Sequence, residues 1–80
     1  MDLSSLTEFL VKSVVTDEEN VSVKQFEDDD LVTIEVLVSS DDMGKVIGKG
    51  GMIAKSIRSI VQASGRLNGV EHVKVNIDSF

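Results

Sequence analysis

The chain has 80 residues, a formal net charge of −6 at pH 7, and neither cysteine nor proline. This length corresponds to one domain that buries only roughly 60–65% of its unfolded surface, so its thin core favours a surface groove over a deep active site. The lack of cysteine excludes disulfides, thiolate metal sites and a cysteine nucleophile, and it indicates a reducing compartment.

A helix is expected over residues 5–15, near an amino terminus that has no basic segment followed by a long apolar run. We therefore expect no secretory signal, and no apolar stretch approaches the roughly 20 residues that cross a bilayer, so a cytoplasmic protein is expected. A capping box of Ser5 and Glu8 marks the predicted start of the helix. Its apolar residues repeat every four positions, at Leu6, Leu10 and Val14.

Two strands joined by an acidic turn are expected next. Alternation predicts a strand over residues 21–26, and the four acids of residues 27–30 predict a turn, because aspartate is poor in strands. Residues 31–38 give the clearest strand pattern. One face of that strand carries only β-branched residues, at Val32, Ile34, Val36 and Val38.

The carboxy-terminal half predicts two helices and a third strand. A short helix is expected over about residues 41–47, and a longer one from Gly51 or Met52 to about Leu67. The longer helix divides into an apolar face (Ile53, Ile57, Ile60 and Val61) and a polar face (Lys55, Arg58, Ser59, Gln62 and Arg66). Alternation at Val73, Val75 and Ile77 predicts the last strand. The order α-β-β-α-α-β predicts an α+β fold with helices packed on one face of a three-stranded sheet.

Charge is distributed unevenly along the chain. Residues 1–42 carry a net charge of −10 and residues 67–80 a net charge of −1, whereas residues 43–66 hold five cations and no acid. A solvated helix face would account for each cation singly, but soluble helices usually mix both signs. The sequence therefore indicates a local basic site, made of Lys45, Lys49, Lys55, Arg58 and Arg66.

The segment Gly48-Lys49-Gly50-Gly51 lies between the two predicted helices. Glycine lets the chain turn sharply and lets a phosphate approach the backbone, and a helix N-terminus attracts anions. An ordinary helix–helix turn is the alternative. The spacing matches neither a P-loop nor a dinucleotide-binding motif, which argues against a nucleotide-binding enzyme.

The string Val46-Ile47-Gly48-Lys49-Gly50-Gly51 resembles the (V/I)-I-G-x-x-G core of the KH family. The chain ends after its last strand and has an additional helix and strand before the core, as in prokaryote-type (type II) KH domains. The stretches 42–49 and 53–58 further resemble the small bacterial KhpA proteins. The resemblance implies one KH domain over residues 1–80, with its core at about residues 31–78, that binds single-stranded RNA by clamping about four nucleotides.

The resemblance also implies how the work is divided among residues. Gly48 to Gly51 would hold the RNA backbone, Lys49 would pair with phosphate, and Lys45, Lys55 and Arg58 would flank the path. Val46, Ile47 and Ile53 would line the base groove. Glycine at position 50 departs from many KH loops, which carry a polar or basic residue there, so weak, sequence-tolerant binding is expected.

For the biological role, the resemblance implies an RNA chaperone or post-transcriptional regulator linked to cell-wall homeostasis and cell shape. It would act beside a second KH protein of the KhpB type or as a homodimer. The alternative is a protein-interaction subunit whose KH fold mainly docks a partner. No enzyme, metal, cofactor or small-molecule substrate is expected, because the single histidine, His72, and the acids of residues 28–30 match no catalytic or EF-hand pattern.

Overall fold

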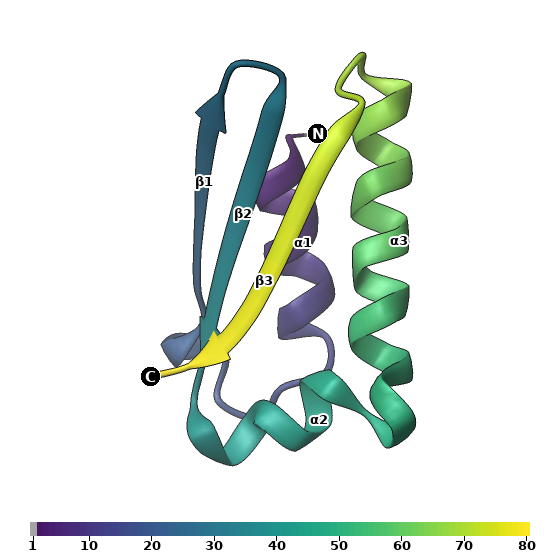
Figure 1. The fold of residues 1–80 in the computed structure, drawn as a ribbon. Helices are drawn as coiled ribbons and strands as arrows, with labels where there is room; N and C mark the ends of the chain where they lie inside the picture. The colour runs from purple at the N-terminus through teal and green to yellow at the C-terminus, as the bar shows by residue number, and fades with distance from the viewer. Residues whose placement is uncertain (1) are drawn as a thin grey trace.

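A three-stranded mixed sheet organises the chain, and the computed structural model describes residues 2–80 (Figure 1). Strand β1 spans Ser22–Asp28, β2 spans Leu31–Val38 and β3 spans His72–Ser79. The strand order is β1-β2-β3, with β1 antiparallel and β3 parallel to the central β2. Strands β1 and β3 are therefore the two edges of the sheet.

Three helices accompany the sheet: α1 (Leu3–Lys12), α2 (Met43–Ile47) and α3 (Met52–Leu67). Helices α1 and α3 cover one face of the sheet, and α2 lies at the end where β2 finishes (Figure 1). Short 3₁₀ turns occupy 18–20, 40–42 and 49–51. The predicted α+β architecture, its element order and its one-sided helical layer are confirmed.

Strand β2 lies at the centre of the core, as its pattern predicts. Val32, Ile34, Val36 and Val38 are at most 5% exposed, and burying each such side chain contributes roughly 1.5–3 kcal/mol. The acidic turn is shorter than predicted, since β1 continues to Asp28 and only Asp29 and Asp30 connect the strands.

Helix α1 starts and ends earlier than the predicted 5–15. Its N-cap is Asp2, whose carboxylate accepts the Ser5 N–H at 2.7 Å, so the predicted capping box at Ser5 and Glu8 is wrong. The most buried face runs through Leu3, Thr7 and Val11 rather than through the predicted repeat. A threonine can lie in the core here because its hydroxyl donates to the Leu3 carbonyl oxygen at 2.7 Å.

Helix α3 begins and ends where the sequence predicts, but its buried face is shifted. Ala54, Ile57, Val61 and Gly65 are buried, whereas Ile60, on the predicted apolar face, is 46% exposed. Gly65 permits close packing on the sheet, because a Cβ atom there would lie 2.7 Å from Cγ2 of Val73.

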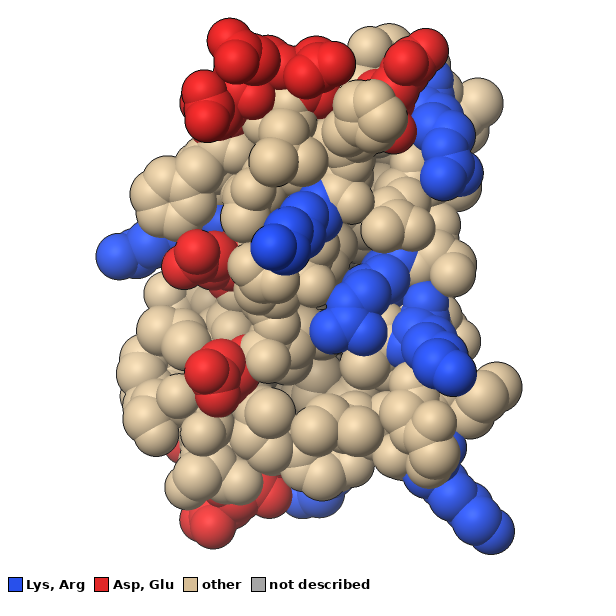
Figure 2. Space-filling view, in the orientation of Figure 1, with Lys and Arg blue, Asp and Glu red and all other residues tan. Residues whose placement is uncertain are grey.

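The surface charges separate by position (Figure 2). Acidic side chains crowd the end of the molecule formed by the β1–β2 turn, and lysine and arginine side chains lie along α3 and β3. Within residues 2–80, no helix is long and apolar enough to span a membrane, and no cluster of three or more potential ligands is placed to hold a metal ion.

Candidate nucleic-acid interface

The glycine loop connects α2 to α3 through an unusual backbone path. Gly48 has φ 73° and ψ 176°, a region that essentially only glycine adopts, and Gly50 and Gly51 also have positive φ. Gly48 has a second reason to be glycine, because a Cβ atom there would lie 2.6 Å from Cγ1 of Ile53. The loop thus turns tightly against the first turn of α3.

No side chain caps the N-terminus of α3, where Gly51 occupies the N-cap position. The backbone N–H groups of a helix start and the helix dipole favour an anion. Lys49 is exposed on the loop just before this helix start. The loop can therefore receive a phosphate from both its backbone and its side chain.

The three predicted apolar groove residues lie in different environments. Ile47 is 41% exposed and Ile53 is half-buried against Gly48, so both can form an apolar wall beside the loop. Val46 is 0% exposed and belongs to the core, where it supports α2 from beneath. The expectation that Val46 lines the groove conflicts with this burial, because helix α2 turns that side chain inward.

Lys45, which is predicted to flank the RNA path, is exposed and lies beside a buried carboxylate. Its ammonium group contacts the Thr16 hydroxyl and lies 3.5 Å from the Asp42 carboxylate. Asp42 is buried, and its two oxygens accept the backbone N–H groups of Asp17 at 2.9 Å and Thr16 at 3.1 Å. These donors hold the pKa of the Asp42 carboxyl below its ordinary value. Lys45 therefore completes a structural network that ties α2 to the segment after α1.

The remaining three cations, Lys55, Arg58 and Arg66, all lie on α3, and the first two are one turn apart. Lys55 is exposed, whereas Arg58 is partly buried and donates from Nε to the Val75 carbonyl oxygen at 3.0 Å. Gln62, one turn further, donates from Nε2 to the Val73 carbonyl oxygen at 3.1 Å. The structure thus brings the glycine loop, Lys55 and Arg58 to the α3–β3 side of the molecule, where Figure 2 shows basic side chains. The sequence predicts Gln62 only as part of a polar face, and its i+4 spacing from Arg58 was the available signal.

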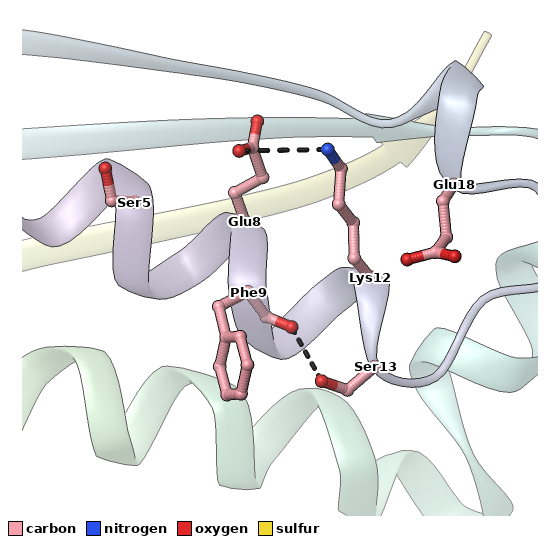
Figure 3. Close-up of a pocket in the computed structure, with 6 residues that line it drawn as sticks. All are labelled: Ser5, Glu8, Phe9, Lys12, Ser13 and Glu18. Atoms are coloured by element: carbon pink, nitrogen blue, oxygen red, sulfur yellow. Dashed lines mark hydrogen bonds and ion pairs between the residues drawn. The ribbon is translucent and has the colours of Figure 1, made fainter.

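A separate hollow of about 320 Å³ lies on the outer side of α1 (Figure 3). Lys12 Nζ lies 3.8 Å from the Glu8 carboxylate, and Ser13 donates to the Phe9 carbonyl oxygen at 2.7 Å. Nothing in it converges on a ligand, and it shares no residue with the glycine loop.

Comparison with known proteins identifies the family. The family model described as "KhpA/KhpB, KH domain" matches residues 4–77. The chain belongs to the KhpA/KhpB family of KH domains. Proteins named RNA-binding protein KhpA are similar to it: one from Clostridium perfringens is 44% identical over 62 residues, which cover 78% of this chain and 83% of the relative. Another from Oceanobacillus iheyensis is 37% identical over 75 residues, covering 94% of this chain and 99% of the relative.

Two solved structures share the fold of this chain. The crystal structure of Aquifex aeolicus Era Y63A bound to GDP·AlF4⁻ matches with a TM-score of 0.69 at 16% identity. The match covers 98% of this chain and 30% of the Era chain. A structure of Era with MgGDPNP and nucleotides 1506–1542 of 16S ribosomal RNA matches with a TM-score of 0.68 at 17% identity, covering 96% of this chain and 29% of that one. At these identities the likeness concerns the fold alone.

Proposed function

We propose that this chain is a non-enzymatic module that binds single-stranded RNA across the Gly48–Gly51 loop. One observation carries the proposal: a loop with three positive-φ glycines leads into the uncapped start of α3, inside a segment of five cations and no acid. KH domains clamp about four nucleotides of backbone with such a loop. The names of the KhpA relatives, which describe RNA-binding proteins, support the same function.

In the proposed complex the loop backbone and Lys49 hold phosphate, and Lys55 and Arg58 flank the strand. Ile47 and Ile53 supply the apolar wall of the base groove. Val46 acts from within the core. Lys45 acts through its contact with Asp42 rather than on RNA, since its ammonium group is already paired.

The salt dependence of binding tests this division of labour. Two cations on phosphate, Lys49 and Lys55, at about −0.7 each, give a slope of log affinity against log salt of roughly −1.4 for single strands. We would measure the slope by fluorescence anisotropy with a labelled RNA octamer. A slope near zero would show that the basic residues do not touch the backbone.

We propose that the chain acts as an RNA chaperone or post-transcriptional regulator in the cytoplasm, with effects on cell shape and the cell wall. A few phosphate contacts give weak binding, so a second RNA-binding unit would raise the affinity through effective concentration. That unit would be a second copy of this chain or a KH protein of the KhpB type.

Exposed apolar side chains favour such association. Phe9 on α1 and Ile60 and Leu67 on α3 are 65%, 46% and 88% exposed. Light scattering with and without a KhpB-type protein measures the mass, and anisotropy measures the RNA affinity of each species. A strict monomer that associates with no such partner and binds RNA equally well alone would defeat the association, while the RNA-binding proposal would stand.

A further inference from the structure

Arg58 and Gln62 bridge the seam between α3 and the edge strand β3. The Arg58 Nε donates to the carbonyl oxygen of Val75, and the Gln62 Nε2 donates to that of Val73. The two side chains are one helical turn apart, and their acceptors are two residues apart on the strand, so helix and strand are matched in register. These two hydrogen bonds hold both side chains between α3 and β3.

These hydrogen bonds to β3 leave other polar groups of Arg58 and Gln62 available to a ligand. Arginine has five N–H donors in a rigid planar fork, and Arg58 uses only the Nε donor among its hydrogen bonds with residues 2–80. The two terminal nitrogens keep their N–H groups. Gln62 keeps its Oε1 acceptor and its second N–H. An exposed lysine such as Lys55 offers no comparable directional array, since its ammonium is a mobile point charge.

Room for a ligand exists beside these groups. A hollow of about 300 Å³ adjoins Gln62 at the same seam, and it is lined by Leu31, Gln62, Arg66, Glu71, His72 and Val73. Single-stranded RNA is recognised by proteins through the Watson–Crick and Hoogsteen edges of unstacked bases. A strand clamped at the glycine loop and running along α3 would carry its bases past Arg58 and toward this hollow.

The chemistry of a two-donor fork selects among the bases. Two parallel N–H groups pair with two adjacent acceptors, which cytosine offers at O2 and N3 and guanine offers at O6 and N7. Uracil and adenine alternate donor and acceptor along their pairing edges, so neither satisfies both N–H groups. The free Oε1 of Gln62 can in addition accept from an exocyclic amino group, which favours cytosine.

We propose that Arg58, held by β3, is a specificity-determining residue that recognises a base with two adjacent acceptors, cytosine or guanine. This inference rests on the RNA-binding function proposed above and deepens it. Arg58 would give a base preference at one nucleotide position, whereas the glycine loop would bind the backbone of any sequence. The competing role for Arg58 is a phosphate contact, which would carry no base preference.

Four RNA octamers test the proposal: octauridylate and the same strand with one central cytosine, guanine or adenine. Each strand can slide along the site, so its central base can reach Arg58 whichever nucleotides the loop holds. We expect the wild-type chain to bind the cytosine or guanine octamer at least about fivefold tighter than octauridylate, and the adenine octamer about as weakly as octauridylate. The relative affinities of the cytosine and guanine octamers decide between these two bases.

Two variants locate the preference. Arg58→Lys keeps the charge and removes the fork, so the four octamers should bind about equally while the salt slope stays unchanged. Arg58→Gln keeps an amide that can reach the Val75 carbonyl, and it serves if the lysine variant loses its circular dichroism signal. Lys55→Ala is the matched control and should weaken all four octamers alike.

Three results would overturn the inference: equal binding of all octamers by the wild type, a preference that survives in Arg58→Lys, or a loss of affinity in Arg58→Gln that is equal for all octamers and comes with a shallower salt slope. The last result would assign Arg58 to phosphate. Failure of every octamer to bind the wild type would instead refute the proposed function itself, so the two failures are distinguishable.

Discussion

Replacing Gly48 by alanine should destabilise the fold strongly, because two separate costs meet at this position. The backbone of Gly48 lies in a region where other residues pay about 1–3 kcal/mol. The added Cβ atom would also lie 2.6 Å from Cγ1 and 2.9 Å from Cβ of Ile53, so Ile53 must shift. We expect a total loss of about 2–4 kcal/mol in the free energy of unfolding, which corresponds to a fall in Tm of roughly 8–32 °C for a domain of this size.

Urea and thermal unfolding of a three-alanine series test this reasoning. Gly51→Ala has positive φ but open space around the new Cβ atom, so it should cost only about 1–2 kcal/mol. Gly44→Ala lies within α2, also with open space, and should be stabilising by about 0.5–1 kcal/mol. The cost of Gly48→Ala should be smaller in an Ile53→Ala background, because that change removes Cγ1 and Cδ1 of Ile53. A Gly48→Ala protein within 0.5 kcal/mol of the wild type would refute the account of the loop, taking about 0.5 kcal/mol as the scatter of neutral surface changes.

The Asp42 network leads to two further predictions. The N–H groups of Asp17 and Thr16 lower the pKa of Asp42, so the ionised carboxylate stabilises the fold above the unfolded pKa, and this effect is lost as pH falls through the folded value. The stability difference between the wild type and Asp42→Asn, measured by urea unfolding, should therefore shrink in acid. A difference that stays constant across pH would contradict this. The same network engages the Lys45 ammonium group, so Lys45→Met should lower RNA affinity less than Lys55→Met does at equal ionic strength. A titration in which Lys45→Met causes the larger loss of affinity would place Lys45 on the RNA path.

The sequence predicts most elements of this fold because their patterns are local. The alternation of β-branched residues fixes β2 at its observed limits, and the glycines around the loop bound α3. The predicted start of helix α1 is too late because Ser5 and Glu8 match a capping box, whereas the N-cap is Asp2. The buried face was missed because Thr7 is a polar residue type. Its hydroxyl is satisfied by the Leu3 carbonyl oxygen, which lets it join the core and moves the buried face.

The candidate site was predictable where it depends on backbone conformation and less so where it depends on distant partners. Glycines with positive φ at the loop follow directly from the residue type. The pairing of Lys45 with Asp42 depends on backbone donors 25 and 26 residues away from that carboxylate, for which the sequence carries no signal. Likewise, the tether of Arg58 to Val75 appears only once β3 lies beside α3.

The most direct test of the RNA-binding proposal replaces both variable positions of the loop. Lys49→Asp with Gly50→Asp places two carboxylates where phosphate should lie, and the space around position 50 is open. The matched control is Lys49→Asn with Gly50→Asn, since asparagine has the same shape and also tolerates the left-handed conformation.

At about 4 Å from phosphate each carboxylate costs about 1 kcal/mol even in bulk water, so the aspartate protein should bind an RNA octamer roughly thirtyfold more weakly than the asparagine control. Circular dichroism should show both proteins folded. Equal affinities of the two folded proteins would contradict the assignment of this loop to the RNA backbone.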